Sequence, residues 1–363
     1  MSDYFAPRLG GIERFSSALC ESLVERGHRV GVLCSATGAG ADERSEWRGI
    51  PVWRMPLAEG IARRDPALIL KSQRTLRAAA QALQPEVVHL HLGGPIAGAW
   101  LGATLLSGVP LLVTVHDMPG APEGFPSIGR VLHQAARITT NSRARLADVL
   151  GFGDDLGAKA SCLPVSRPPR GVDRTQVQRN RTPLVFMAGR QEARKGFDLA
   201  LHAFVAVLDQ HPRARLALAG DGPEHAAIRA LANRLGLDPF VEHLGAIDDE
   251  GIARMQARAW LCLVPSRHSE SFGLAALEAM LAGTAVVASD TGGLPEVVED
   301  GVTGLLVEPG SVDSLSAAMS RLLADPAALF AMGDAGRRRA QAQFGWRQCV
   351  EDHETALATA AAA

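Results

Sequence analysis

The sequence is poor in several features that mark particular protein classes. Aromatic residues make up only 5% of the chain, with a single tyrosine, and 37 Lys and Arg stand against 39 Asp and Glu. Base-stacking platforms and basic surfaces for nucleic acid are therefore not expected. The five cysteines form no Cys-x-x-Cys pair and several lie in apolar runs, which indicates reduced thiols in a core.

Long apolar runs are also missing. No stretch reaches the roughly 18 uninterrupted apolar residues typical of a membrane-spanning helix. The start, MSDYFAPR, does not resemble a signal peptide. We therefore predict a cytoplasmic protein, and a peripheral contact with the inner face of the membrane stays open.

Short β-branched runs alternate with helical patterns along the chain. The strand candidates are 28–35, 50–55, 86–92, 110–116, 136–140 and 158–165 in the first half, and 183–189, 214–220, 240–245, 259–265, 284–289 and 304–308 in the second. Strands that alternate with helices and are apolar throughout predict parallel, doubly wound sheets.

The length suggests two domains at about 150 residues each. A stretch with three prolines, many charges and no periodicity, residues 166–183, is typical of a linker. We predict a first domain over 1–170, a second over 171–345, and a C-terminal helix over 346–363 whose alanine-rich end frays. Ligands of such α/β folds bind at the carboxyl ends of the strands.

Two motifs of the second half follow predicted strands. GRQEARKG, residues 189–196, supplies Arg190 and Lys195, and a guanidinium together with an ammonium suits a diphosphate. GDGPE, residues 220–224, predicts a strand-turn-helix connection with Pro223 at the first helical position. We interpret the second motif as mainly architectural.

The most informative motif is SESFGLAALEAMLAG, residues 269–283. The backbone amides of Phe272, Gly273 and Leu274 would lie at a helix start, where helices bind anions. Glu270 precedes these amides, and Glu278 follows on an otherwise apolar helix. A carboxylate in such a place needs partners, and ribose hydroxyls would be suitable ones.

The first half carries weaker signals. Gly10 and Gly11 precede an amphipathic helix, which fits either an anion site or a plain turn. His116, in TVHD, follows a predicted strand, and we expect it to face the cleft, where it could bond a sugar hydroxyl, although a lone histidine after a strand is more often structural. His89 and His91 share one face of a strand, but no further ligand stands at metal-binding spacing, so we predict no metal site.

Together these motifs, with SDTGGLPEVVEDGVTGLLVEPG, resemble the GT-B-fold retaining glycosyltransferases of family four, typified by bacterial mannosyl- and glucosyltransferases. The resemblance implies two Rossmann-like domains that face a cleft, and an EC 2.4-type hexosyltransferase that needs no cofactor, because the UDP-, GDP- or ADP-sugar is itself a substrate. The resemblance implies a glycan or a lipid-linked molecule as acceptor. No short motif of the sequence identifies the acceptor or the sugar. No Asp-x-Asp metal motif appears.

The resemblance also implies roles for the residues. Arg190 and Lys195 would hold the diphosphate, Glu278 the ribose, and Glu270 with the neighbouring amides the sugar and phosphate. The first domain would bind the acceptor. The predicted catalytic residues are Glu270, His116, Arg190 and Lys195, and the predicted donor-binding residues are Gly10, Gly11, Arg190, Lys195, Glu270, Phe272, Gly273, Leu274 and Glu278.

Two departures from the family pattern stand out. LPVSRPPRGVD, residues 163–173, keeps only Gly-Val-Asp of the usual linker turn, and Met1 to Phe5 are too few for a full first strand at about 3.3 Å per residue. We therefore expect a first domain without its first strand, and roughly six to ten further apolar residues upstream in the natural protein.

A non-catalytic nucleotide-sugar-binding protein and a nucleotide-sugar epimerase remain alternatives.

Overall fold

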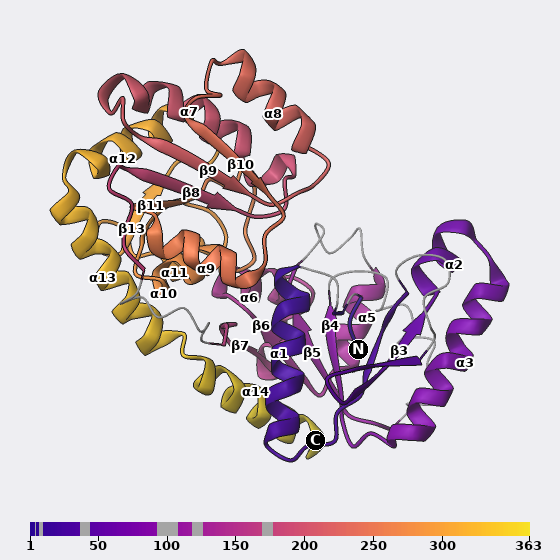
Figure 1. The fold of residues 1–363 in the computed structure, drawn as a ribbon. Coiled ribbons are helices and arrows are strands. Elements are labelled where there is room, and N and C mark those ends of the chain that lie inside the picture. Colours follow the sequence, from indigo (N-terminus) through magenta and orange to yellow (C-terminus); the bar gives the residue numbers. More distant parts are fainter. Residues whose placement is uncertain (4, 7–9, 37–43, 93–107, 118–125, 169–176) are drawn as a thin grey trace. The chain divides into compact units, whose positions relative to one another are not determined.

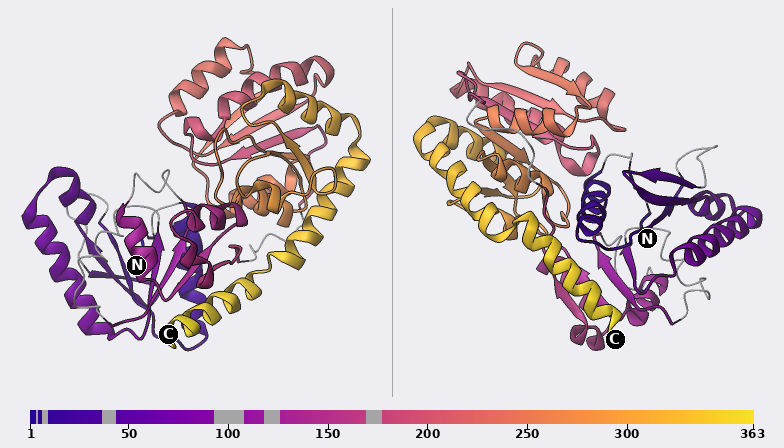
Figure 2. Two further views of the ribbon diagram at one scale, coloured as in Figure 1. Left: turned by 180° about the vertical axis from the view of Figure 1, so that it is seen from behind. Right: turned by 60° about the horizontal axis from the view of Figure 1, so that its bottom comes forward.

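The computed structural model describes the chain except for residues 4, 7–9, 37–43, 93–107, 118–125 and 169–176. The chain divides into two compact α/β units (Figures 1 and 2). Unit 1 comprises Met1–Val165 and Arg347–Ala363, and unit 2 comprises Ser166–Trp346. Unit 2 thus begins at the first residue of the predicted linker, 166–183. Residues 169–176 of this linker lie outside the described residues.

Unit 2 is built on a single parallel sheet. Its strands are β8 (Leu184–Ala188), β9 (Arg215–Ala219), β10 (Val241–Gly245), β11 (Leu261–Val264), β12 (Ala285–Ser289) and β13 (Gly304–Val307). Their spatial order is β10-β9-β8-β11-β12-β13, with every neighbouring pair parallel. This is the doubly wound arrangement predicted from the apolar runs of the second half, and its strand order reverses between β8 and β11.

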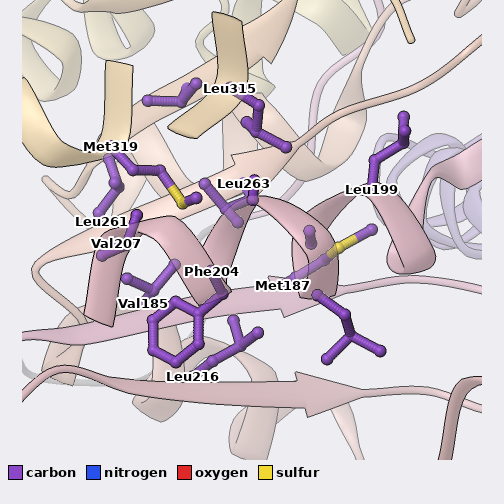
Figure 3. Packing of buried hydrophobic residues seen from close by; sticks show 14 of the residues in the cluster. Val185, Met187, Leu199, Phe204, Val207, Leu216, Leu261, Leu263, Leu315 and Met319 are labelled. Atoms are coloured by element: carbon purple, nitrogen blue, oxygen red, sulfur yellow. The ribbon is translucent and has the colours of Figure 1, made fainter. Parts of the chain in front are cut away.

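Helices cover both faces of this sheet (Figure 1). They are α7 (Phe197–Gln210), α8 (His225–Arg234), α9 (Asp249–Arg258), α10 (Leu274–Leu281), α11 (Leu294–Val297), α12 (Val312–Ala324) and α13 (Pro326–Gln343). Helix α7 packs against α8 and α12, whereas α10 packs against α9 and α13. The core under α7 and α12 includes Phe204, Met319 and Leu216 (Figure 3). Burial of such apolar side chains is the main stabilising contribution to the unit.

The strands of unit 1 fall into two groups. Strand β3 (Ile50–Met55) pairs in parallel with β1 (Val32–Ser35) and antiparallel with β2 (Arg44–Trp47). The second group is parallel, in the order β4 (Val88–Leu92), β5 (Leu111–Val115), β6 (Arg137–Thr140) and β7 (Ala160–Cys162). The six predicted strands of the first half are confirmed, whereas β2 was not predicted.

The beginning of the chain joins these two groups. Ser2 forms parallel bridges with both Cys34 of β1 and His91 of β4. Its amide donates to Leu33, and the amide of His91 donates to Met1. The expectation that the first strand is absent is thus met in part, because the described residues have only bridges at Ser2, between β1 and β4.

The helices in the described part of unit 1 are α1 (Gly11–Glu25), α2 (Leu57–Arg63), α3 (Pro66–Leu83), α5 (Pro126–Gln134), α6 (Arg143–Leu150), the short 3-10 helix η3 (Asp154–Ala158) and α14 (Trp346–Ala361). Alternate residues of β1 face opposite sides. Val32 and Cys34 pack with Phe5 and Cys20, on the side of α1, whereas Leu33 packs with residues of α3 and α5. Unit 1 is therefore also covered on both faces.

Two local expectations about helices were wrong. The alanine-rich end of the chain does not fray, because α14 continues to Ala361 and buries Val350, His353 and Ala360. Alanine has the highest intrinsic helix propensity, and packing adds to it. Helix α8 begins at His225, so Pro223 stands in the preceding turn rather than at the first helical position. No helix among the described residues is long and apolar enough to cross a membrane.

Candidate functional site

The loop that follows β8 carries the predicted diphosphate-binding side chains. It runs through Arg190 and the 3-10 helix η5 (Ala193–Lys195) to Gly196, the residue directly before α7. Gly196 has a φ of 74°, and a Cβ added there would lie 2.2 Å from the carbonyl oxygen of Pro265. Only glycine allows this close approach, which brings the loop against the segment that follows β11.

Lys195 and Glu270 meet across these two segments. The Lys195 ammonium bonds Oε1 of Glu270, and the hydroxyl of Ser266 donates to the same oxygen at 2.6 Å. Lys195 follows β8 and Glu270 follows β11, the neighbouring strands between which the strand order reverses. Ligands of doubly wound sheets bind outside the carboxyl ends of the strands at such a switch point. The structure therefore brings two predicted catalytic residues together where a ligand is expected.

The Glu270 carboxylate is held in its charged form. Burial alone would raise its pKa, but the Lys195 ammonium and the hydrogen bonds from Lys195 and Ser266 outweigh burial and lower the pKa below its ordinary value. A buried anion with a cation beside it can accept hydrogen bonds from ligand hydroxyls at neutral pH.

Arg190 is more exposed, with 59% of its side chain accessible. Its Nε lies 2.7 Å from Oε1 of Glu192, and the other oxygen of Glu192 binds Nε of Arg194 at 2.9 Å. One carboxylate thus holds two guanidinium groups on the loop. The sequence analysis placed Arg190 here but missed Glu192.

GDGPE supports the same loop, in keeping with an architectural role. A Cβ on Gly220 (φ 120°) would lie 1.9 Å from the carbonyl oxygen of Gly189. The amide of Gln191 donates to the carbonyl of Asp221, and the amide of Glu224 donates to that of Gln191. The turn after β9 therefore fixes the backbone on both sides of Arg190.

A second brace is the pair Arg267–Asp198, which the sequence analysis also missed. The Arg267 guanidinium contacts both carboxylate oxygens of Asp198 at the start of α7, one of them at 2.7 Å, and donates to the carbonyl of Ala193 at 2.8 Å. Bidentate pairs of this kind fix geometry as well as adding energy. They hold η5 in place and with it Lys195.

The predicted amide cluster lies at the N-terminus of α10. Gly273 is the N-cap residue in the left-handed conformation, with a φ of 104°, and has no side chain with which to cap the helix. Phe272 is buried edge-on against Phe344, with ring centroids 5.5 Å apart. Its side chain therefore belongs to the core, and only its backbone is available to a ligand. Leu274 is the first residue of the helix, where the backbone amides favour an anion.

Glu278 lies one turn further along α10 and has a partner within unit 2. Its Oε1 accepts from Nε of Arg167 at 2.9 Å, and the same guanidinium reaches Asp249 at 3.3 Å. The side chain of Arg167 is only 5% exposed. The buried carboxylate was expected to need partners, and Arg167 is one that the linker sequence did not indicate.

Unit 1 places its predicted residues differently. His116 is only 3% exposed, and its Nε2 lies 2.8 Å from Nδ1 of His91 with the two rings stacked. Burial, followed by the neighbouring His353, lowers the pKa of His116 to about 3. The structure therefore places the His116 imidazole in the interior of unit 1, against His91, and the catalytic role of His116 stays a prediction.

Gly10 and Gly11 lie at the N-terminus of α1, as the amphipathic pattern predicted. Gly10 is the N-cap residue, and a Cβ added to it would lie 2.1 Å from Oε2 of Glu13. An acidic side chain of the first turn thus lies against this end of the helix, where negative charge is favourable. A role of these glycines in donor binding stays a prediction.

Metal ligands do not gather in the part of the chain that the structure describes, where no group of three or more His, Cys, Asp or Glu could hold an ion. His89 bonds the hydroxyl of Thr114 at 2.6 Å, and His91 bonds His116.

Comparisons with known proteins cover both units. The profile of the family described as glycosyl transferases group 1 matches residues 172–339, and that of a glycosyl transferase 4-like domain matches residues 10–159. A D-inositol 3-phosphate glycosyltransferase of Kribbella flavida is 30% identical over 97% of this chain and 91% of its own. A GDP-mannose-dependent α-(1-6)-phosphatidylinositol monomannoside mannosyltransferase of Mycolicibacterium smegmatis is 27% identical over 94% and 93%.

A solved structure with the same fold is that of HepE from Anabaena in complex with UDP-glucose. It is 20% identical, matches 99% of this chain and 100% of its own, and has a TM-score of 0.77.

Proposed function

Because this chain belongs to the GT-B-fold glycosyltransferases of family four, and is thus a transferase that uses a nucleotide-sugar donor, we propose that it transfers a hexosyl group with retention of the anomeric configuration. The observation that carries the proposal is the Lys195–Glu270 pair at the switch point of the unit 2 sheet. It offers a cation for the leaving diphosphate and an ionised carboxylate for the sugar.

The donor would lie along the carboxyl edge of the sheet. Arg190 and Lys195 bind the diphosphate, together with the amides at the start of α10, and stabilise the charge that develops as it leaves. Glu270 accepts hydrogen bonds from sugar hydroxyls. Glu278 binds the ribose with the carboxylate that Arg167 orients.

In the proposed reaction the bond between the anomeric carbon and the diphosphate oxygen breaks while the acceptor oxygen bonds the same face of that carbon. The departing diphosphate oxygen takes the acceptor proton, so that no protein base is required. The two cations take over the charge-stabilising role that a divalent metal ion has in other transferases. We therefore propose a reaction without metal ion or cofactor.

The names of the relatives narrow the choice of acceptor. One relative is named for D-inositol 3-phosphate and another for a phosphatidylinositol mannoside. We infer that the acceptor is an inositol phosphate or a lipid-linked polyol. For the donor, the name of the mannosyltransferase, which specifies GDP-mannose, favours a GDP-sugar.

Turnover measurements separate the proposal from its two alternatives. Purified protein is incubated with UDP-, GDP- and ADP-sugars, with and without D-inositol 3-phosphate, and nucleoside diphosphate and glycosylated product are measured. A transferase releases both in the presence of acceptor. An epimerase converts the donor sugar without acceptor, and a binding protein releases nothing, so either result would overturn the proposal.

The stereochemistry is read from the product. With an α-linked donor, NMR of the purified glycoside gives the one-bond coupling constant between the anomeric carbon and its proton, which differs between α- and β-glycosides. We expect an α-glycoside, and a β-glycoside would mean inversion.

We further propose that the protein works at an anionic membrane surface inside the cell, through the exposed side of α2 and α3. Ile61 and Leu70 are 48% and 54% exposed there. They are accompanied by a set of exposed basic residues: Arg63, Arg64, Lys71, Arg74 and Arg77. Helical surfaces that combine apolar and basic side chains bind anionic lipid interfaces.

Cosedimentation tests this contact. The protein should pellet with vesicles that contain phosphatidylserine, less so at high salt, and not with pure phosphatidylcholine vesicles. A Leu70→Glu/Arg74→Glu variant should lose the association, whereas Val205→Glu, at an exposed apolar residue of α7, should keep it. Equal binding of all three proteins would contradict the proposal.

A further inference from the structure

A loop at residues 290–293 connects β12 to α11 and has no part in the reaction proposed so far. It belongs to the motif SDTGGLPEVVEDGVTGLLVEPG. The loop leaves the carboxyl end of β12, which pairs in parallel with β11. Since Glu270 follows β11, the two connections begin side by side at the carboxyl edge of the sheet, where ligands of doubly wound folds bind.

The loop holds the backbone of Glu270 by a hydrogen bond. The amide of Gly293 donates to the carbonyl oxygen of Glu270 at 2.8 Å. The side chain of Glu270 is fixed separately, because Lys195 and Ser266 both bond its Oε1. Glu270 is thus held from the connections that follow three neighbouring strands, β8, β11 and β12.

Gly292 packs directly on the backbone of Glu270. Its φ is 58°, and a Cβ added there would collide with the carbonyl oxygen of Glu270 and lie 2.7 Å from the nitrogen of the same residue. These atoms belong to the backbone, so a larger residue at this position has to displace Glu270 itself. Only glycine allows the observed approach.

The residue after the loop fixes the other end of the Glu270 segment. Leu294, the first residue of α11, is completely buried, and a Cβ added to Gly273 would lie 2.6 Å from its Cδ2. Gly273 is the N-cap residue of α10, against which α11 packs (Figure 1). Residues 292–294 therefore contact both Glu270 and the start of α10.

We propose that Gly292, Gly293 and Leu294 are positioning residues, which fix the Glu270 carboxylate relative to the amides at the start of α10. They act through Glu270 and Gly273 rather than by contact with the donor. The inference rests on the proposed function, in which the carboxylate takes the sugar and the amides take the diphosphate. A misplacement of reacting groups by about 1 Å can slow a reaction roughly a hundredfold, so this geometry matters to the rate.

A glycine is also required where only the turn itself needs a positive φ, and the same motif supplies a control for that case. Gly301, in the turn before β13, has a φ of 72° and is exposed. Among the described residues, no atom beyond its chain neighbours lies within 4 Å of a Cβ added there. Gly292→Ala and Gly301→Ala therefore share the backbone strain, but only Gly292→Ala collides with Glu270.

The test compares the parent protein with these two variants. Carbon NMR of glutamate-labelled protein follows the titration of the Glu270 carboxyl in the folded state, and Glu270→Gln identifies its signal. In the parent, Lys195, Ser266 and Arg194 hold the pKa of this carboxyl below its ordinary value despite burial. The turnover number, the KM for the nucleotide-sugar and thermal melting are measured on the same proteins.

We expect Gly292→Ala to raise the pKa of Glu270, because the carboxylate moves away from Lys195, and to lower the turnover number at least about tenfold. The KM should stay near that of the parent, since Arg190 and Glu278 are not displaced. Gly301→Ala should leave the pKa and the turnover number unchanged. A parent-like pKa of Glu270 in Gly292→Ala, or equal changes in both variants, would overturn the proposal.

If Gly292→Ala does not fold, hydrogen exchange of the Gly293 amide in the parent decides. An amide that holds Glu270 should exchange at least about a hundredfold more slowly than a free amide, and exchange at the free rate would overturn the proposal. Neither the titration nor the exchange requires glycosyl transfer. A raised pKa of Glu270 in proteins that transfer no sugar would therefore count against the proposed function alone, and a parent-like pKa in an active enzyme against this inference alone.

Discussion

The ammonium of Lys195 and the carboxylate of Glu270 form an ion pair across the two loops that leave the neighbouring strands β8 and β11. The pair joins a group suited to a diphosphate with a group suited to a sugar. The two residues lie close together because the carboxyl ends of the parallel strands β8 and β11 lie at the same edge of the sheet.

Replacement of Lys195 by methionine should raise the pKa of Glu270. In the parent, the lowered pKa stabilises the fold above the ordinary pKa of a glutamate, and this stabilisation is lost as the pH falls through the folded value. Without Lys195 burial dominates, and stability at pH 7 should fall by about 1.5–3 kcal/mol, as for a lost hydrogen bond to a charged group. Urea unfolding at pH 7 measures this change.

The matched control is a double-mutant cycle with Glu270→Gln, which should itself depress catalysis while the fold stays intact. The double variant should be less destabilised than the sum of the single variants, because each single change leaves one charge behind. Additive effects would show that the two side chains do not interact.

Arg190→Ala should slow turnover by at least about a hundredfold without unfolding the protein, because Arg190 is exposed on the loop and is proposed to stabilise the leaving diphosphate. Arg194→Ala is the control, since Arg194 shares the partner Glu192 but has no proposed role in the reaction. Steady-state rates with saturating donor compare the two. Equal losses of turnover in the two variants would mean that both changes act by disturbing the loop, and that the Arg190 guanidinium has no separate role.

Glu278→Gln should weaken donor binding by tenfold or more, in line with the loss of a charged hydrogen-bond acceptor to ribose. Asp249→Asn removes the other carboxylate that contacts Arg167 and is the matched control. Calorimetric titration with nucleotide-sugar should give near-parent affinity for this control. If both variants bind equally weakly, Glu278 acts only by holding Arg167.

Four buried histidines should make unit 1 sensitive to acid. Burial is the largest cause of the lowered pKa values of His89, His91, His116 and His353. Below about pH 6.5 the unfolded chain takes up protons that the folded chain does not, so stability is present above that pH and is lost below it. Each such proton contributes about 1.4 kcal/mol per pH unit. Melting between pH 7.5 and pH 5 should show this loss.

His353→Leu should reduce that pH dependence by about one proton. Nε2 of His353 is buried without a hydrogen-bond partner among the described residues, and Nδ1 lies 2.7 Å from the carbonyl oxygen of Cys349, so leucine removes one contact within α14. His268→Gln, at an exposed residue, is the control and should leave the slope unchanged. Identical slopes in all three proteins would contradict the assignment to the buried histidines.

The strands that the sequence predicts best are those buried on both faces. Strand β12, for example, is apolar and buried throughout, which makes its run visible without knowledge of its neighbours. Strand β2 was not predicted because Arg44–Trp47 is polar and partly exposed. Among the described residues it pairs only with β3, through the turn at Arg48 and Gly49. Its strand character depends on pairing, which no local pattern encodes.

The candidate site was likewise predicted only in part. Arg190, Lys195, Glu270 and Glu278 were identified from motifs at strand ends, but their partners were not. Arg167 lies in a proline-rich, charged stretch that gives no sign of a buried guanidinium. Its approach to Glu278 spans 111 residues of sequence and depends on tertiary packing alone.

The account rests on a nucleotide-sugar site in unit 2 that works without a divalent metal ion. Hydrogen exchange of the intact protein in EDTA, with and without the nucleotide-sugar that supports turnover, tests this claim most directly. We expect slower exchange in residues 189–196 and 270–278, and the same turnover after Mg²⁺ or Mn²⁺ is added. Protection that lies outside these two segments, or binding and turnover that appear only with added metal ion, would contradict it.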